Sequence, residues 1–261
     1  METSKRPTLA VALIVKNEAE NLHDCLASVV GWVDEIVVLD SGSTDTTLNI
    51  AQTFNARIFI NTDWQGFGKQ RQLAQSYVQS EWVLWLDADE RVTPELRAEI
   101  QWQLQNSLSA NTVFAIPRLS WAFGRFIRHS GWYPDYVLRL YPKDLTHYDD
   151  SLVHEKVIIL SNTAIKRLQN HITHYPYRDI QHYFIKTSGY LSSWAQQKHA
   201  QGKTTTLLQA FTHSLVCFIR MYIFKAGILD GSQGFILATI GTYTTFIKYV
   251  ELWITQQSDK S

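Results

Sequence analysis

The sequence predicts an α/β fold with a mostly parallel sheet flanked by helices, followed by a helical, aromatic-rich C-terminal extension. Short apolar runs alternate with amphipathic helical patterns through residues 8–100, and this alternation is typical of a parallel, doubly wound sheet. From about residue 113 the expected strands are separated by loops, and from about residue 179 the pattern becomes helical. We therefore expect an α/β domain over 1–178, with halves at 1–112 and 113–178, and a helical region over 179–261.

The expected strands are apolar runs of buried-strand length, rich in β-branched residues. Those of the first half are 8–15 (TLAVALIV), 36–40 (IVVLD), 56–60 (ARIFI) and 82–87 (WVLWLD), and those of the second half are 112–121, 136–142 and 156–160 (KVIIL).

Helical patterns with plausible start signals lie between the first strands. Asn17 and Glu20 have the spacing of a capping box, Ser43 is a candidate N-cap, and Thr93 precedes Pro94 at a first helical position.

Composition excludes several classes of protein. Lys+Arg and Asp+Glu both number 24, so no overall charge excess favours nucleic acid as a partner. The two cysteines, Cys25 and Cys217, have no metal-like spacing, which fits a reducing compartment and core positions. No window offers about 18 uninterrupted apolar residues, so we expect no membrane-spanning segment.

Polar residues cluster where the expected strands end. Asn17 and Glu18 follow the first strand, residues 40–45 the second, Asp63 the third, and Asp87 and Asp89 the fourth. Because ligands of open α/β sheets bind outside the carboxyl ends of the strands, we expect a binding site at this edge.

The segment LWLDADE (84–90) ends an apolar run in three acids. On an extended segment the side chains of Asp87 and Asp89 point the same way, and two close carboxylates repel unless a cation joins them. Mg²⁺ or Mn²⁺ prefers carboxylates, water and diphosphate oxygens, so we interpret the pair as a divalent-cation site. The alternative is an acidic turn that caps the next helix.

Two further motifs suit a nucleotide ligand. In DSGSTDTT, Gly42 lets backbone N–H groups approach a ligand, and the carboxylate of Asp40 can accept hydrogen bonds from a base or ribose. In GFGKQRQLA, Lys69 and Arg71 stand at a helix start, where the macrodipole disfavours cations, so a diphosphate would account for them. The alternatives are ordinary turn residues and solvated surface charges.

The second half holds two candidates for a general base, Asp135 before one expected strand and Glu155 in the turn before another. A carboxylate near apolar walls has a raised proton affinity, so either could serve. The alternative for each is a structural hydrogen bond. His171 and His174 are interpreted as structural.

With VKNE, LDSGSTDTT, GFGKQRQLA and LDADE in this order and spacing, the chain resembles the family 2 glycosyltransferases with the GT-A fold. Together with GWYPDYVLRLY, VHEKV and GILDGSQGF, it is similar to the bacterial lipopolysaccharide core glucosyltransferases that add β-1,4-linked glucose to inner-core heptose. The resemblance covers nearly the whole chain, and the first four motifs together are specific to the superfamily.

The resemblance implies an inverting transfer of a hexose, here glucose, from a UDP-sugar with the aid of Mg²⁺ or Mn²⁺. It makes 1–112 the nucleotide-sugar half and 113–178 the acceptor half. It places Asn17, Glu18, Asp40 and Gly42 at the nucleotide, Lys69 and Arg71 in the nucleotide region, Asp87 at the ribose or metal shell, Asp89 at the metal and Glu155 as the base. His154 is an alternative contact for the metal or a phosphate.

Three readings compete for the function. A sugar-phosphate nucleotidyltransferase would carry a Gly-rich basic loop after the first strand, where this chain has KNE. A non-catalytic nucleotide-sugar module would bind without turnover. A glycosyltransferase acting on polyprenyl phosphate would also suit the apolar C-terminal helices.

The acceptor implied by the resemblance is lipopolysaccharide core at the cytoplasmic face of the inner membrane. The segment LVCFIRMYIF (215–224) is apolar almost all round but contains Arg220. Such a helix either lies in a membrane interface or packs on the α/β domain, and we favour the interface and a peripheral location.

Overall fold

The computed structural model describes residues 6–106, 111–152 and 155–258. The chain forms two compact units, one of residues up to 118 together with 135–174, and the other of 119–134 together with 175 onward. The second unit therefore includes a segment, 119–134, that the sequence prediction placed in the acceptor half.

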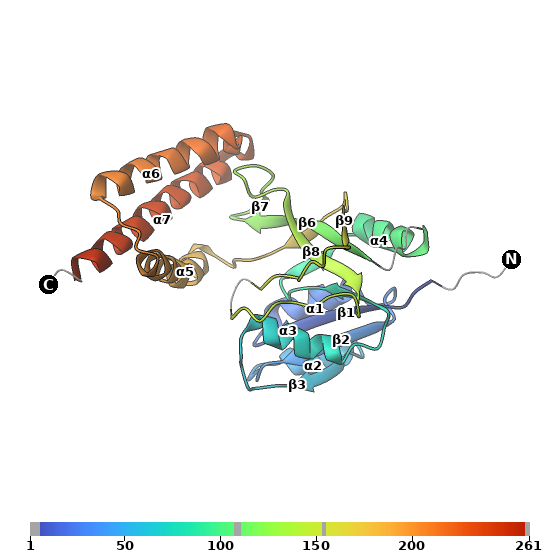
Figure 1. Cartoon of the computed structure of the whole chain (residues 1–261). Helices are drawn as coiled ribbons and strands as arrows, with labels where there is room; N and C mark the ends of the chain where they lie inside the picture. Colours follow the sequence, from blue (N-terminus) through green and yellow to red (C-terminus); the bar gives the residue numbers. More distant parts are fainter. Residues whose placement is uncertain (1–5, 107–110, 153–154, 259–261) are drawn as a thin grey trace. The chain divides into compact units, whose positions relative to one another are not determined.

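The first unit is an α/β sandwich around one mixed sheet (Figure 1). Strands β3, β2, β1 and β4 are adjacent and parallel, and β8 then joins β4 antiparallel and leads to β6, β10 and β5. The strands are β1 (Leu9–Val15), β2 (Glu35–Asp40), β3 (Arg57–Ile60), β4 (Trp82–Trp85), β5 (Glu90–Val92), β6 (Thr112–Ala122), β8 (Asp135–Pro142), β9 (Ala164–Arg167) and β10 (Ile172–His174).

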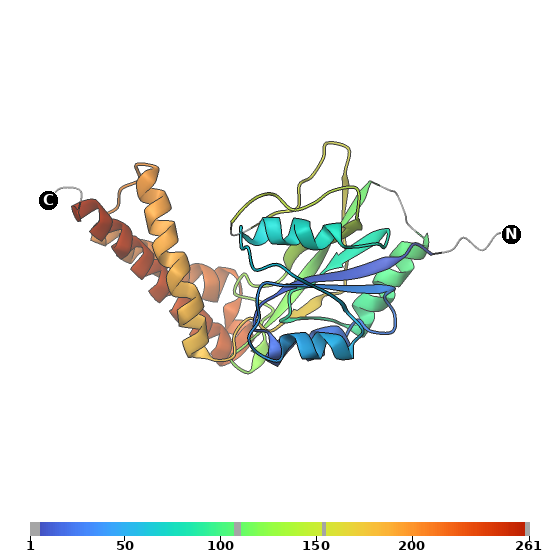
Figure 2. The same cartoon turned by 90° about the horizontal axis from the view of Figure 1, so that it is seen from below.

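Helices cover both faces of this sheet, as Figure 2 shows with α3 on one side and α1 and α2 on the other. The helices are α1 (Ala19–Ala27), α2 (Thr47–Thr53), α3 (Phe67–Ser76) and α4 (Pro94–Asn106). The core under α1 and α4 includes Leu22, Leu26 and Ile100, and the core under α3 includes Ala74 and Trp85. This confirms the predicted fold, and it brings the ends of β1, β2 and β4 to one edge.

The strand predictions hold best for the buried parallel strands. Residues 156–160 do not form a strand: Val157 makes only an isolated bridge to Tyr148, and Ile158, Ile159 and Leu160 are exposed. The short strands β5, β9 and β10 were not predicted, because their three or four residues carry too little pattern to identify them.

The predicted helix start near Lys69 is confirmed by α3, whereas among the predicted N-cap residues only that of α4 is confirmed. Thr93 Oγ1 accepts a hydrogen bond from Leu96 N (3.2 Å) ahead of Pro94. The predicted capping box of Asn17 and Glu20 is wrong, because α1 begins at Ala19 with Glu18 as its N-cap and no side-chain cap bond. Ser43 is also not the N-cap of α2, since Thr46 occupies that position.

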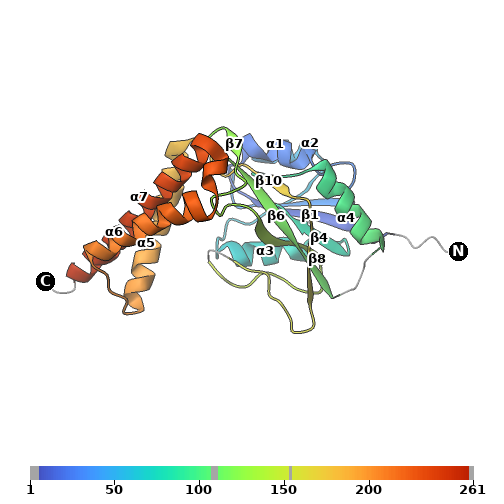
Figure 3. The same ribbon diagram turned by 90° about the horizontal axis from the view of Figure 1, so that it is seen from above.

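The second unit contains the short strand β7 (Arg125–Phe126), which pairs with the end of β6, and a set of helices (Figure 3). The helices are α5 (Ile180–Ala200), α6 (Leu207–Ile219), the π-helix η1 (Arg220–Phe224), the 3-10 helix η2 (Gly227–Asp230) and α7 (Gly231–Ser258). Helix α7 packs against both α5 and α6.

Within residues 6–106, 111–152 and 155–258, one helical segment, Leu207–Phe224, is long and apolar enough by length and composition to cross a membrane, and 11% of it is buried. This segment is not an uninterrupted apolar run, because it contains Gln209, His213 and Arg220, and the absence of a membrane-spanning segment stays a prediction. Cys25 is buried in the core of the first unit as predicted, whereas Cys217 is half-buried, and both are free thiols.

Candidate functional site

The loops after β1 and β2 are joined by hydrogen bonds between them. Asn17 N donates to Ser43 Oγ (2.9 Å), and Thr44 N donates to Asn17 Oδ1 (2.8 Å). Asp45 Oδ2 accepts from Ala19 N (3.2 Å), so the start of α1 is capped from the neighbouring loop. Asn17 is thus a structural bridge with a left-handed backbone (φ 55°). Glu18 lies beside it, and its Oε2 accepts from Asn21 (3.2 Å).

Asp40 is almost fully buried and organises the turn that follows β2. Its Oδ2 accepts from Gly42 N and Ser43 N, both at 2.8 Å, and its other oxygen accepts from Ser43 Oγ. Gly42 has φ +90°, which favours glycine, and a Cβ there would lie 3.1 Å from Thr62. Both residues lie at the predicted edge, and their contact with a nucleotide stays a prediction.

The acidic pair after β4 does not lie on an extended segment. Strand β4 ends at Trp85, and Glu90 N donates to Asp87 O (2.9 Å), so residues 87–90 form a turn. The rule that side chains two apart point the same way therefore does not apply. Asp87 and Asp89 have partners on different elements.

Asp87 lies between two buried arginines. Its Oδ1 accepts from Arg71 Nη2 (2.6 Å) of α3, and its Oδ2 pairs with Arg139 Nη2 of β8. Burial raises the pKa of Asp87, but the charges of Arg139 and Arg71 outweigh it and hold that pKa well below its usual value. Each carboxylate oxygen of Asp87 thus already accepts from a guanidinium, and its contact with a ribose or a metal ion stays a prediction.

The two arginines continue a chain of alternating charges. Arg71 Nε also donates to Glu155 Oε1 (2.8 Å), Arg139 Nη2 to Glu90 Oε1 (3.0 Å), and Arg118 contacts both Glu90 (3.4 Å) and Asp135 (2.5 Å). We call it the charge chain, and its members are Glu155, Arg71, Asp87, Arg139, Glu90, Arg118 and Asp135.

The charge chain links both candidate bases to the turn after β4. Glu155 has a side chain 14% exposed, whereas the side chain of Asp135 is 45% exposed. Arg71 is buried over the rings of Trp85 (5.1 Å) and Tyr148 (4.9 Å), and its Nη1 has no partner among the described residues.

Lys69 and Arg71 have carboxylate partners at the start of α3. Lys69 Nζ pairs with Asp150 Oδ1 at 2.7 Å. Phe67 N and Gly68 N donate to the carbonyls of Leu152 and Ser151, so a loop of the chain occupies the helix N-terminus. These carboxylate partners account for two cations at the start of a helix, and no bound ligand is needed to explain them. Contact of Lys69 and Arg71 with a nucleotide stays a prediction.

Asp89 points to a residue that the sequence interpretation set aside. Its Oδ2 lies 3.6 Å from His174 Nε2, and both side chains are less than one-fifth exposed. The pairing of β10 with β5 places His174 opposite Glu90 and so beside the acidic turn. The residues around His174 in the sequence form no metal-binding motif, so His174 could not be identified from them. Histidine is nevertheless a common metal ligand, and its closeness to Asp89 appears only in the structure.

Asp89 and His174 form a candidate pair of ligands for a divalent cation. Within the described residues no group of three His, Cys, Asp or Glu side chains could hold a metal ion. Asp89 and His174 together offer one oxygen and one nitrogen, and a diphosphate would have to supply further oxygens. His154, the alternative metal or phosphate contact, lies outside the described residues.

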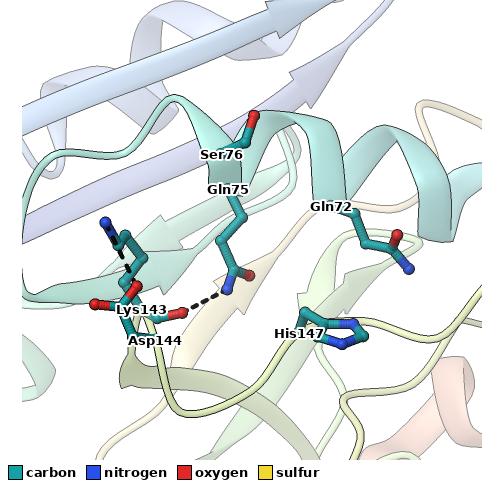
Figure 4. A pocket seen from close by; sticks show the side chains of 6 residues that line it. All are labelled: Gln72, Gln75, Ser76, Lys143, Asp144 and His147. Atoms are coloured by element: carbon teal, nitrogen blue, oxygen red, sulfur yellow. Dashed lines mark hydrogen bonds and ion pairs between the residues drawn. The ribbon is translucent and has the colours of Figure 1, made fainter.

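Two surface pockets lie apart from this site. One of about 340 Å³ lies beside α3, and its lining includes Gln75, which donates to the Lys143 carbonyl (Figure 4). The other, of about 220 Å³, lies at the amino ends of β2 and β3 and is lined by Glu35 and Arg57 among others. Neither is lined by a predicted site residue.

Comparison with known proteins gives a consistent family. Residues 10–168 match the model of glycosyl transferase family 2. An uncharacterized glycosyltransferase of Rickettsia prowazekii (strain Madrid E) is 25% identical over 252 residues, covering 94% of this chain and 86% of the relative. The lipopolysaccharide core biosynthesis glycosyltransferase LpsC of Rhizobium meliloti (strain 1021) is 27% identical over 256 residues, covering 94% and 92%.

Among solved structures, TarS 1-349 of S. aureus in complex with UDP-GlcNAc aligns with a TM-score of 0.50 at 13% identity. The alignment covers 97% of this chain and 92% of that one, which supports the fold.

Proposed function

Because the chain belongs to glycosyl transferase family 2, we propose that it transfers a hexose, glucose in the first instance, from a UDP-sugar to an inner-core heptose of lipopolysaccharide, with inversion at the anomeric carbon. The observation that carries this proposal is the pair of ionic contacts made by the turn after β4. Asp89 lies beside His174, and Asp87 joins the charge chain, at the carboxyl end of a parallel strand, where α/β folds bind ligands. The similarity to LpsC supports the acceptor class.

In this proposal the donor lies along the loops after β1 and β2, with Glu18, Asp40 and the backbone around Gly42 at the nucleotide. Asp89 and His174 would hold Mg²⁺ or Mn²⁺, which neutralises charge developing on the departing diphosphate. Asn17 and Asp87 shape the site through their hydrogen bonds and ion pairs. Lys69 and Arg71 are paired with Asp150, Glu155 and Asp87, so a diphosphate would share their donors with those carboxylates.

We assign the general base to Glu155 in preference to Asp135. Among the described residues, Glu155 has one ion pair, to Arg71 Nε, and a mostly buried side chain, whereas Asp135 accepts from both Nε and Nη2 of Arg118. A base must lie within reach of the acceptor hydroxyl, and the hydrogen bond from Arg71 Nε holds the Glu155 side chain in one orientation. Departure of the leaving group and deprotonation of the acceptor then proceed without a protein nucleophile.

The base assignment predicts unequal effects for two carboxamide variants. Glu155→Gln should lower kcat roughly a hundredfold or more with a small change in KM for the donor, because loss of a general base removes transition-state stabilisation. Asp135→Asn should lower kcat less than about tenfold. Initial rates with saturating UDP-sugar measure both, and the reverse order of effects would transfer the assignment to Asp135.

Donor and acceptor are tested by release of UDP from a panel of UDP-sugars, with and without lipopolysaccharide truncated to inner-core heptose. We expect the fastest release with UDP-glucose plus the truncated acceptor, and a product containing one added hexose by mass spectrometry. Faster transfer to polyprenyl phosphate would identify that lipid as the acceptor in place of lipopolysaccharide. Release of diphosphate instead of UDP would indicate a nucleotidyltransferase.

We also place the enzyme at the cytoplasmic face of the inner membrane as a peripheral protein. Two observations support this location: both cysteines are free thiols, as suits a reducing compartment, and α6 exposes apolar side chains. Residues 1–178 would form the catalytic domain, apart from 119–134, which belong to the second unit, and 179–261 would form the helical, membrane-associated region.

A further inference from the structure

The second unit differs in charge from the chain as a whole. Its described part, 119–134 and 175–258, contains nine Lys and Arg but three Asp and Glu, although the whole chain has 24 of each sign. Residues 180–229 contain five Lys and Arg and no acidic residue, and Asp230 is fully buried. The described part of the second unit therefore has an excess of positive charge.

Helix α6 has its small residues inside and its large apolar residues outside. Ala210 and Ser214 are buried, whereas Leu208, Phe211 and Leu215 are 72%, 60% and 50% exposed. Helix α7 also lies close to η1, because a Cβ on Gly241 of α7 would lie 2.6 Å from Met221 Sδ. A water-exposed helix buries its large apolar residues, whereas helices packed in lipid meet through small residues and turn large ones outward.

The apolar surface continues into the turn between α6 and α7. We call residues 223–229 the hairpin tip. Phe224 is 79% exposed, Ile223 61%, Leu229 63% and Ile228 59%. Exposed apolar side chains so concentrated mark an interaction surface.

A loop that contains Arg125 and Arg128 is hydrogen-bonded to Lys225 in the hairpin tip and to Asp230 directly after it. Asp230 Oδ2 accepts from His129 N (2.8 Å) and its Oδ1 from Arg128 N (3.3 Å), while Ser130 N donates to the Lys225 carbonyl (2.8 Å). Arg125 Nη1 donates to the Asp230 carbonyl (2.9 Å). Buried Asp230 thus fixes Arg125, Arg128 and His129 next to exposed Phe224, Ile228 and Leu229.

We propose that the hairpin tip and the outer face of α6 insert into the interface of an anionic phospholipid bilayer, with Arg128, Lys225 and Arg220 at the lipid phosphates. Apolar residues beside cations are the pattern of interfacial helices, whose affinity combines buried apolar area with attraction to anionic headgroups. The absence of acidic residues over 180–229 makes the surface complementary to an anionic bilayer. This identifies the partner surface of the proposed membrane location, and it does not depend on which sugar is transferred.

Flotation of the full chain with phosphatidylcholine vesicles, with and without phosphatidylglycerol, tests the proposal without any activity measurement. We expect flotation with phosphatidylglycerol only, and a decline as salt is raised, since exposed charges are screened. Equal binding to neutral vesicles, or binding that resists high salt and alkaline carbonate, would overturn the interfacial anionic mode.

Two pairs of matched variants locate the surface. Ile228→Ser with Leu229→Ser, and separately Arg128→Glu with Lys225→Glu, should each lower vesicle affinity at least about tenfold. The control variants change the same kinds of exposed side chain in the first unit. Trp102→Ser with Ile165→Ser removes two apolar side chains, and Lys166→Glu with Arg167→Glu reverses two positive charges. Equal losses in variants and controls would contradict the assignment.

Circular dichroism of each variant shows whether a loss of vesicle binding comes from unfolding. UDP release from UDP-glucose is measured separately, so that failure of the proposed reaction is not mistaken for loss of vesicle binding. A stable dimer by light scattering in the absence of lipid, without flotation, would assign the apolar surface to a second copy and overturn the proposal.

Discussion

Replacing Asp89 by Asn is expected to lower sugar transfer at least about a thousandfold, because the carboxylate is the anionic member of the proposed cation site and such a site supplies several kcal/mol of transition-state stabilisation. The side chain is 19% exposed and lies 3.6 Å from His174 Nε2, so the amide keeps the shape of the residue while removing its charge. Initial rates of UDP-glucose turnover at saturating Mn²⁺ measure the effect. Asp144→Asn, at an exposed carboxylate, is the matched control.

His174→Ala should weaken the apparent affinity for Mn²⁺ about 10- to 100-fold, the loss expected when a group that supports a metal is removed. Because activity alone cannot distinguish metal binding from a structural effect, the free Mn²⁺ signal in electron paramagnetic resonance should be titrated in the presence of protein and UDP. His23→Ala at an exposed histidine is the control. Unchanged Mn²⁺ binding in His174→Ala would remove His174 from the site, and full activity in excess EDTA would exclude a metal requirement.

The difference between Asp87 and Asp89 shows where sequence reasoning succeeds and where it ends. The parallel strands β1, β2 and β4 were predicted because their burial on both faces is encoded in continuous apolar runs. The edge where polar residues gather follows from the fold class. Which carboxylate meets which partner was not predictable, because Arg139 and His174 come from strands far along the chain.

The same limit applies to the loops. Thr93 caps its own helix and was predicted from three adjacent residues. Asn17 and Asp45 instead accept hydrogen bonds from backbone N–H groups of the other loop. A short sequence motif does not specify partners that lie more than 20 residues away. The segment 156–160 has a strand-like composition but stays largely outside the sheet, because composition does not specify a neighbouring strand.

Replacing Asp87 by Asn should destabilise the fold by about 3 kcal/mol at neutral pH, because it leaves the buried guanidinium groups of Arg71 and Arg139 without their shared counter-charge. Those side chains are 4% and 6% exposed, whereas Asp87 is 32% exposed, so most of the cost comes from the arginines. Urea unfolding of the variant and of Asp144→Asn, compared at pH 7, measures the difference.

The pH dependence gives the same prediction a second readout. Burial raises the pKa of Asp87, but Arg139 and Arg71 lower it further, so the folded-state pKa lies below the ordinary value of 3.8. A carboxyl whose pKa is depressed on folding contributes stability that is full above the unfolded-state pKa and is lost as pH falls toward the folded-state pKa. The gap in unfolding free energy between the native chain and Asp87→Asn should therefore be constant from pH 7 to about 5 and narrow below about 4. A gap that does not change with pH would mean that the carboxylate contributes through packing or hydrogen bonding and not through its charge.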